Sequence, residues 1–452
     1  MEAYMSNKLR KILFLLFIIS FITITPLVML YAAGYKLNLG SGRVEKTGVL
    51  NIETLPKGAA VYLNGSPRKA ASLSGFFGEN APITTPAKIK NLLPGEYAVK
   101  LELDGYWDWE RKIKINSGEA ASFDGIVLIR KDMPLLIASS SGEGASLSPD
   151  KKKFTYLSEK GGEIFFTDRE TSSGLDGAAE AEKAVWSTDG RAVLIGEKLY
   201  KESSGWTGAD LSSALKKDYG PVRFDDTNSE KIYFLKSNDI YRVSADLKSA
   251  ENPIKINGEA EDYMVSGDRL AYASRISSKV FLNIWNLKDA KTERSVELPF
   301  SADYEFIAGG NGIIRLLDKT RKILYIIDPA AFAPIKEIIN GAGKVYRIDD
   351  DNFLFANDFE IWKAGSGGAD RELLTRLSRE VKDLIWHPDG KFIIFSTRES
   401  INMLEISGNE RKVTTLANMD FVASPVLDGR GESIYFFGSD KGVKGIYKLR
   451  IR

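Results

Sequence analysis

The chain of 452 residues contains no cysteine and a single histidine, His387. The lack of cysteine excludes disulfides, thiol nucleophiles, and zinc or iron–sulfur sites that depend on thiolates. We interpret His387 as a turn residue, because Pro388-Asp389-Gly390 follows it and such a position asks only for a tolerant polar side chain. Net charge is also low, with 62 Lys and Arg against 61 Asp and Glu. This balance gives no electrostatic reason to expect a nucleic-acid partner.

One long segment, residues 12–33, lacks charged residues altogether. At about 1.5 Å per residue a helix of this length crosses a hydrocarbon core of roughly 30 Å. Lys8, Arg10 and Lys11 precede it and predict a cytoplasmic N-terminus. We therefore interpret residues 1–34 as a cytoplasmic stub and a single-pass signal anchor in the cytoplasmic membrane, with the rest of the chain extracytoplasmic. The alternative is a cleaved signal peptide, whose apolar region usually has only 7–15 residues.

The next segment carries the turn and strand signals of a small all-β domain. Residues 35–47 are polar and contain glycine, so we interpret them as a stalk. Within residues 48–130, Asn64-Gly65 follows an alternating strand and predicts a hairpin, because both central residues of a type I′ turn need positive φ. The strand pattern over residues 97–103 alternates as a half-buried strand does. We predict a β-sandwich of roughly 80 residues.

Specific motifs in this segment resemble the PEGA domain family. They are, in order, Pro56-x-Gly58-Ala59, Tyr62-Leu63-Asn64-Gly65, Thr85-Pro86, Leu93-Pro94-Gly95-x-Tyr97 and Gly105-Tyr106. The resemblance implies a small β-sandwich of prokaryotic surface and envelope proteins, without catalysis. One departure is an insertion at residues 66–84, which contains Phe76 and Phe77. These two aromatic residues are candidates for a contact loop, unless they fold back to cover the protein itself.

A sequence repeat occupies the remainder of the chain, residues 131–452. In each copy an apolar position leads into a turn of Ser, Pro, Asp, Asn or Gly, and two β-rich runs follow. The apolar positions lie 38 to 42 residues apart, at Leu147, Trp186, Phe224, Val265, Ile307, Ile348, Trp386 and Leu427. A period near 40 without long helical segments predicts a β-propeller of eight four-stranded blades. Seven is the alternative, if the copy around Val265 or Ile307 is not a blade.

The ends of the repeat predict how the ring closes. The last copy supplies three strands, and residues 134–137 form a strand-like run that has no blade of its own. Pairing this run as the outer strand of the last blade removes two exposed sheet edges. Leu147-Ser148-Pro149-Asp150, Trp186-Ser187-Thr188-Asp189-Gly190 and Trp386-His387-Pro388-Asp389-Gly390 resemble the turns of TolB-like propellers. That resemblance implies a fold and not a function.

Acidic clusters are the main candidates for chemistry in the repeat. Asp225 and Asp226 form one cluster, and Asp349, Asp350 and Asp351 form another. Both occur at the turn position of the repeat, where aspartate is favoured by its hydrogen bonds to the backbone. Calcium ligation and a carboxylate pair for glycoside hydrolysis remain the alternatives.

Three tryptophans do not follow the repeat and are candidates for a contact surface: Trp107, Trp109 and Trp206. We predict no catalytic residue and no cofactor. The interpretation that we favour is a membrane-anchored extracytoplasmic binding or scaffold protein of the prokaryotic envelope, whose propeller docks a protein or a glycan. The alternative is an envelope glycosidase or lyase. Acidic residues from different blades, about 5–10 Å apart at the propeller axis, would favour the enzyme.

Overall fold

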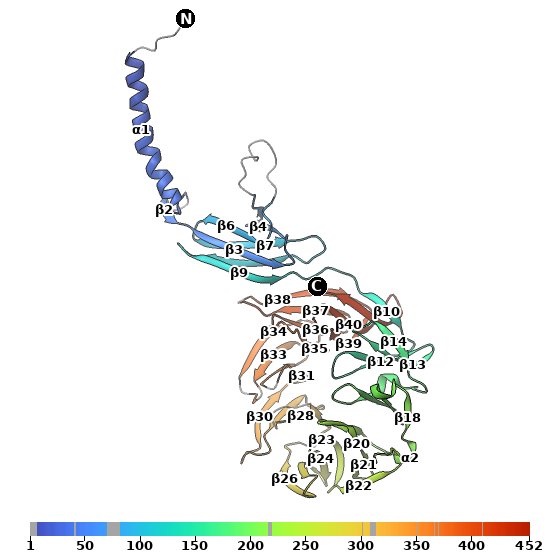
Figure 1. The fold of residues 1–452 in the computed structure, drawn as a ribbon. Coiled ribbons are helices and arrows are strands. Elements are labelled where there is room, and N and C mark those ends of the chain that lie inside the picture. Colours follow the sequence, from blue (N-terminus) through green and yellow to red (C-terminus); the bar gives the residue numbers. More distant parts are fainter. Residues whose placement is uncertain are drawn as a thin grey trace. The chain divides into compact units, whose positions relative to one another are not determined.

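A computed structural model of the chain divides into two compact units, Met1–Asp132 and Met133–Ile451 (Figure 1). It describes residues 7–39, 42–69, 82–215, 219–300, 302–307, 313–349, 351–365, 367–368, 370–408 and 410–452. Apart from one long helix, the described residues are mostly β-strands. The all-β prediction is therefore confirmed.

Helix α1, Asn7–Ala32, begins the first unit. Its segment Arg10–Ala32 is long and apolar enough to cross a membrane, and no residue of its most apolar stretch is buried by the protein. Phe14 and Phe17 are 66% and 67% exposed, so the described chain does not cover this part of the helix. A helix that is apolar on every side needs an apolar environment. Both a membrane anchor and a signal sequence have this composition.

A two-stranded hairpin follows the helix where we interpreted the sequence as a stalk. Strand β1, Tyr35–Asn38, pairs with β2, Arg43–Lys46. The backbone N–H and the hydroxyl of Thr47 both donate to the carbonyl of Gly34, each at 2.7 Å, and hold the base of the hairpin.

Two sheets then form a β-sandwich. One has the order β6–β3–β9 and the other the order β5–β4–β7–β8. The bounds are β3 Gly48–Leu55, β4 Ala60–Leu63, β5 Ser66–Pro67, β6 Ala87–Leu92, β7 Gly95–Glu102, β8 Trp109–Ile115 and β9 Ala120–Val127. Alternate residues of β3 face the core, as in Leu50 and Ile52, which follows the period of two in the sequence. Asn64 and Gly65 both have positive φ, 52° and 77°, which confirms the predicted hairpin turn.

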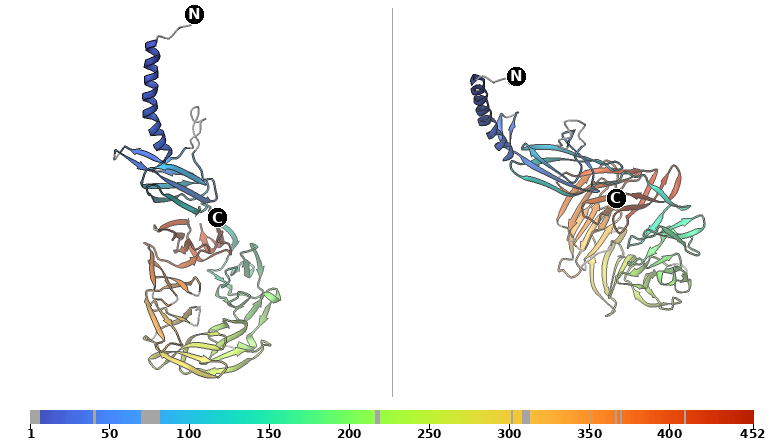
Figure 2. Two further views of the ribbon diagram at one scale, coloured as in Figure 1. Left: turned by 60° about the vertical axis from the view of Figure 1, so that its left-hand side comes forward. Right: turned by 45° about the horizontal axis from the view of Figure 1, so that its top comes forward.

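The second unit is a propeller of eight four-stranded blades in the described residues. Blades 1 to 8 follow the order of the repeat, and Figure 2 shows them succeeding one another around a ring. The copies around Val265 and Ile307 each form a complete blade, so the alternative of seven blades is wrong. The blades are β11–β14, β15–β18, β19–β22, β23–β26, β27–β30, β31–β34, β35–β38, and β39–β41 with β10.

The strands of blades 1 to 4 are β11 Ala145–Leu147, β12 Lys153–Ser158, β13 Gly161–Phe166, β14 Thr171–Gly174, β15 Val185–Trp186, β16 Ala192–Ile195, β17 Lys198–Lys201, β18 Gly208–Asp210, β19 Val222–Asp225, β20 Asn228–Lys236, β21 Asp239–Val243, β22 Ala250–Lys255, β23 Glu259–Ser266, β24 Arg269–Ile276, β25 Lys279–Asn286 and β26 Lys291–Glu297. Short helical segments at Ala181–Lys183, Glu202–Ser204 and Ser212–Leu215 (α2) connect them.

The strands of blades 5 to 8 are β27 Tyr304–Ile307, β28 Ile314–Asp318, β29 Ile323–Ile327, β30 Ile335–Asn340, β31 Lys344–Arg347, β32 Asn352–Ala356, β33 Glu360–Gly365, β34 Arg371–Arg376, β35 Asp383–Trp386, β36 Phe392–Ser396, β37 Ser400–Glu405, β38 Lys412–Asn418, β39 Phe421–Leu427, β40 Ser433–Asp440, β41 Val443–Arg450 and, from before the first blade, β10 Leu135–Ser139.

Strand β10 closes the ring as predicted. It pairs antiparallel with β41, with Leu135 opposite Lys448 and Ser139 opposite Gly445. The two backbones are close, since a Cβ added to Gly445 would lie 2.2 Å from the carbonyl oxygen of Ala138. Glycine in a strand often marks such an approach. The last blade thus takes one strand from before the first blade and three from the end of the repeat.

His387 lies in the predicted turn, but the expectation that any small polar side chain would serve there is wrong. Its side chain is 1% exposed and packs edge-on against Phe392. Nδ1 lies 2.7 Å from Oδ1 of Asp389, and Nε2 lies 2.9 Å from the carbonyl oxygen of Gly431 in the next blade. The imidazole is therefore a buried link between blades 7 and 8, and a smaller polar side chain would not make both contacts.

Candidate ligand site at the centre of the propeller

The turn between the first two strands of a blade has a recurrent geometry. In blade 2, the hydroxyl of Ser187 donates to Asp189 at 2.7 Å, and the same carboxylate oxygen accepts the backbone N–H of Arg191 at 3.0 Å. Gly190 between them has φ of 67°. Glycine suits this left-handed conformation because it has no Cβ. Blade 7 repeats the arrangement, with φ of 71° at Gly390.

Blade 1 keeps this turn but places Lys151 at the glycine position. Ser148 donates to Asp150 at 2.5 Å, and Asp150 accepts the backbone N–H of Lys152 at 3.1 Å. Lys151 adopts φ of 58°. A residue with a Cβ is less stable there than glycine by about 1 kcal/mol. The turn therefore accepts backbone strain at a position where its two counterparts avoid it.

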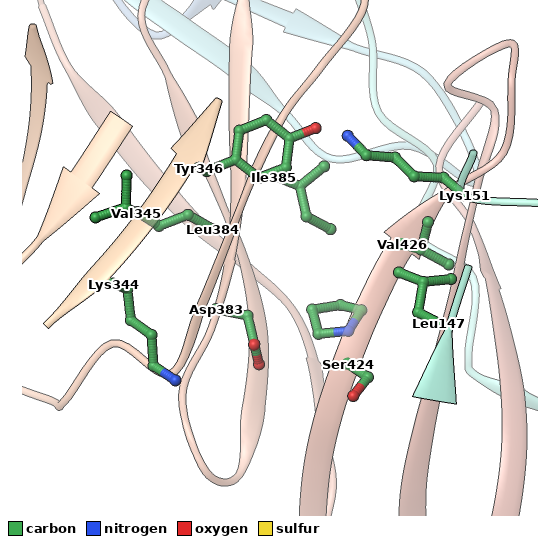
Figure 3. A pocket seen from close by; sticks show the side chains of 11 residues that line it. Leu147, Lys151, Lys344, Val345, Tyr346, Asp383, Leu384, Ile385, Ser424 and Val426 are labelled. Carbon is green, nitrogen blue, oxygen red and sulfur yellow. The ribbon is translucent and has the colours of Figure 1, made fainter. Parts of the chain in front are cut away.

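The Lys151 side chain extends into a cavity of about 290 Å³ at the centre of the propeller (Figure 3). First strands of neighbouring blades contact one another at the centre, as β31 does with β35, and β39 with both β35 and β11. Four blades therefore form the walls. The lining residues are Leu147 and Lys151 from blade 1, Lys344, Val345 and Tyr346 from blade 6, Asp383, Leu384 and Ile385 from blade 7, and Ser424, Pro425 and Val426 from blade 8.

A second backbone irregularity lies in the wall of the same cavity. Strand β39 has a bulge between Ala423 and Val426, and Ser424 within it has φ of 49°. A bulge redirects side chains that would otherwise alternate across the sheet. Ser424 and Pro425 both line the cavity as a result. Strained residues at functional sites persist because the surrounding structure holds them.

The charge of Lys151 is only partly compensated. Its Nζ lies 4.1 Å from the centroid of the Tyr346 ring, and the two side chains point toward each other across the cavity (Figure 3). No carboxylate among the described residues forms an ion pair with this ammonium group. Loss of hydration in the protein lowers the pKa of Lys151 to about 8. At neutral pH the group is therefore mostly protonated, and its one contact with a described side chain that compensates the charge is the ring face of Tyr346.

Two other charged residues, Lys344 and Asp383, lie on the opposite wall (Figure 3). The carboxylate of Asp383 accepts a hydrogen bond from the Ser396 hydroxyl at 2.8 Å. It is the one carboxylate in the described lining of the cavity. The pair of carboxylates that glycoside hydrolysis requires is therefore not assembled in this lining.

The acidic clusters predicted from the sequence have turn geometry. Asp225 is buried and accepts hydrogen bonds from the backbone N–H and hydroxyl of Thr227 and from the N–H of Gly267. Asp349 accepts the N–H groups of Asp351 and Asn352 at 2.8 and 2.7 Å. These bonds account for aspartate at both positions.

The calcium alternative receives no support from the described part of the chain. Within it, no three acidic or histidine side chains are grouped so that they would hold a metal ion. Asp350 lies outside the described residues. Asp226 is exposed at the surface, yet partial loss of hydration raises the pKa of its carboxyl to about 6, and the charge of Asp225 adds to this shift.

Two of the three candidate tryptophans belong to hydrophobic cores. Trp109 and Trp206 are each 7% exposed. Trp109 packs in the sandwich core, and Trp206 packs edge-on against Trp186 with ring centroids 6.3 Å apart. The expectation of a contact surface is therefore not supported for these two. Trp107 is half-buried beneath Lys131, whose Nζ lies 4.9 Å from the ring centroid, and Phe76 and Phe77 lie outside the described residues.

Comparison with known families identifies part of the first unit. Residues 76–127 match the PEGA domain. The resemblance seen in the sequence is thus confirmed for this segment, which includes strands β6 to β9 of the sandwich. No curated protein matches the chain.

Solved structures with similar folds include dipeptidyl peptidase 4 of Porphyromonas gingivalis, with 13% identity and a TM-score of 0.49, covering 69% of this chain and 58% of that one. The C-terminal WD40 domain of Sif2 has 9% identity and a TM-score of 0.48, with 70% and 98% covered. The Dos1 propeller has 11% identity and a TM-score of 0.45, with 72% and 96% covered. The chain spans little more than half the length of the peptidase. These low scores carry no functional argument, and the propeller assignment rests on the strand pairing described above.

Proposed function

We propose that this protein is a binding protein of the prokaryotic cell envelope, anchored in the cytoplasmic membrane by α1, whose propeller binds its partner at the central cavity. The observation that carries the proposal is the cavity itself, with four blades as walls, a strained lysine, and an ammonium charge that lacks a counter-ion in the described chain. Largely preformed, mostly apolar cavities with a few polar groups are typical binding sites.

The predicted membrane topology and the order of the domains support the same proposal. Basic residues before α1 favour a cytoplasmic N-terminus and an extracytoplasmic position for the rest of the chain. The PEGA match fits an envelope protein, and within this proposal the sandwich serves as a spacer. The Ser-x-Asp turns of blades 1 and 2 agree with kinship to TolB-like propellers.

Binding is favoured over catalysis by the composition of the cavity. Six of its lining residues are aliphatic or proline: Leu147, Val345, Leu384, Ile385, Pro425 and Val426. Asp383 has no second carboxylate in the described lining with which to share acid and base roles. A partner that is bound here is recognised by shape, by the lysine charge and by apolar contact.

Site-specific photocrosslinking in cells tests the proposal. A photoreactive amino acid at Lys344, on the wall of the cavity, is expected to capture a partner in the membrane fraction. Phe332, which is fully exposed outside the cavity, is the matched control position. The membrane fraction should resist carbonate extraction, and external protease should digest the chain beyond α1 in spheroplasts. A soluble protein, or equal capture at the two positions, would contradict the proposal.

A further inference from the structure

We propose that the central cavity binds the free C-terminal carboxylate of a peptide chain together with its last, apolar side chain, and that Lys151 is the counter-ion of this carboxylate. The inference rests on the proposed function only in taking the cavity as the binding site. It adds the chemical class of the ligand.

The charged residues that line the cavity favour a ligand with a single negative charge. The cavity contains two lysines, Lys151 and Lys344, and one aspartate, Asp383. A desolvated ammonium group that has only an aromatic face as its neighbour gains most from an oxyanion placed directly against it. A phosphate dianion would meet the charge of Asp383, and no arginine is present among the described lining residues to bind it through two parallel hydrogen bonds. A carboxylate fits this balance better.

The walls argue for an apolar group beside the carboxylate. Leucine, isoleucine, valine and proline side chains surround the space between Lys151 and the strands of blades 6 to 8. A sugar acid would leave its hydroxyl groups without partners on these walls, which is unfavourable. At about 290 Å³ the cavity is just below the usual size range of ligand sites, so it accepts one or two residues and not a folded domain.

The backbone of Lys151 is consistent with this assignment. Glycine occupies the same left-handed position in blades 2 and 7, and Lys151 has φ of 58° there. Stability alone would favour glycine in blade 1 as well. A strained lysine is explained if its side chain is needed at the centre of the ring, where it meets Tyr346.

Peptide binding to the full chain in detergent micelles tests this assignment. The probe is fluorescein-labelled Ala-Ala-Ala-Leu with a free C-terminus, and its C-terminal amide is the control. Fluorescence anisotropy is expected to show that the amide binds at least tenfold more weakly. Equal affinity of acid and amide would overturn the proposal, and so would stronger competition by inorganic phosphate than by the unlabelled acid.

Variants at neighbouring lysines assign the effect to Lys151. Lys151→Met and Lys151→Gly should both reduce affinity at least tenfold, whereas Lys152→Met removes the same charge one residue away and should bind as the wild type does. Lys151→Gly should also raise the melting temperature by about 2 °C, because it relieves the strain. Unchanged binding by Lys151→Met would overturn the proposal. Failure of the peptide to bind, with crosslinking at Lys344 intact, would refute the ligand class and leave the proposed function standing.

A different observation carries a second inference, about the hairpin of β1 and β2. We propose that its apolar face lies in the membrane interface. Leu37 is directly opposite Val44, and Tyr35, Leu37, Leu39 and Val44 are all exposed, Leu39 to 88%. Lys36 pairs with Glu45 and belongs to the other, polar face. An isolated hairpin is marginally stable in water, so an uncovered apolar face needs a partner.

The membrane is the partner that the chain itself favours. Two residues separate the end of α1 at Ala32 from the start of β1 at Tyr35, which limits their separation to roughly 10 Å. Lys36, Arg43 and Lys46 add positive charge that suits anionic headgroups. This inference rests on α1 being retained as an anchor, and carbonate extraction tests that separately.

The absence of cysteine allows a clean labelling experiment. Leu37→Cys and Lys36→Cys, each labelled with the fluorophore NBD, place a probe on the two faces at adjacent positions. In vesicles of phosphatidylethanolamine and phosphatidylglycerol, the Leu37 probe should emit at shorter wavelength and be quenched by doxyl-labelled lipid, and the Lys36 probe should not. Identical emission and quenching at the two positions would refute the interfacial hairpin.

Discussion

The first turn of blade 1 and the first turn of blade 7 follow the same backbone path but differ in two residues. Blade 7 has His387 where blade 1 has Ser148, and it has Gly390 where blade 1 has Lys151. In both, an aspartate accepts the N–H group two residues later, at 2.9 Å in blade 7 and 3.1 Å in blade 1. The aspartate therefore defines the turn, and the other two positions are free to acquire local roles.

The two substitutions serve different ends. His387 connects its blade to Gly431 of the next one, so this departure stabilises the ring. Lys151 strains its own backbone, and its side chain enters the central cavity, where it contacts blade 6 through the ring face of Tyr346. A departure that strains its own turn and places a charged side chain in a cavity is the kind expected at a functional position.

The largest effect on stability is expected where β10 pairs with β41 and closes the ring. Gly445→Val would place side-chain atoms against the carbonyl of Ala138 and the side chain of Leu136, so β10 would have to move. We expect a loss of at least about 3 kcal/mol in the free energy of unfolding. Gly174→Val in β14 is the control, because nothing lies within 4 Å of its added Cβ. Thermal and urea denaturation measure both, and similar stability of the two variants would contradict the closure.

The closure of the ring was predictable from the sequence, because the repeat fixes how many strands each blade needs and therefore shows which blade lacks one. Three strands after Phe421 need a fourth, and residues 134–137 were the unassigned run beside the first copy. The number of blades follows from the same period. The alternation around Leu50 and Ile52 likewise predicted the sandwich core.

The ligand site was not predictable in the same way. It needs residues from blades 1, 6, 7 and 8 to meet, and no local pattern specifies which side chains converge at the axis. The one available signal was lysine at a position where two other copies have glycine. The prediction of a contact surface at Trp206 failed for a related reason. This residue does not follow the repeat, but its backbone has φ of 65° and its side chain packs against Trp186 of the same blade.

The next effect in size concerns the link made by blade 7. His387→Ser gives blade 7 the residue of blades 1 and 2, and the serine hydroxyl should replace the imidazole as the partner of Asp389. The variant should also lose the contact with Gly431 and leave space beside Phe392. We expect a loss of about 2 kcal/mol, measured by urea denaturation. Stability equal to that of the wild type would mean that the contact between blades contributes nothing.

A smaller effect, of opposite sign in the two blades, is expected at the left-handed position. Gly390→Lys introduces the strain of blade 1 into blade 7 and should lower the free energy of unfolding by about 1 kcal/mol. Lys151→Gly removes the strain and should raise it by a similar amount. Differential scanning calorimetry of the two variants compares them directly. Shifts of the same sign would show that the two turns are not equivalent.

The last effect is the contribution of Lys151 to the dependence of stability on pH, which has no counterpart in the turn of blade 7 because Gly390 does not titrate. Loss of hydration lowers the pKa of Lys151 to about 8 in the folded protein, from an ordinary value near 10.5 in the unfolded chain. Between these two values the unfolded chain binds more protons, so the free energy of unfolding should rise as pH increases from about 8 to 10. Solvent contact in the cavity will keep the rise modest. Urea denaturation of the wild type and of Lys151→Met at pH 7, 8, 9 and 10 isolates it, because Lys344, Asp383 and Tyr346 are common to both proteins. A difference between the two that stays constant over this range would show that Lys151 keeps an ordinary pKa, and the cavity would then lack the desolvated charge on which recognition of a carboxylate depends.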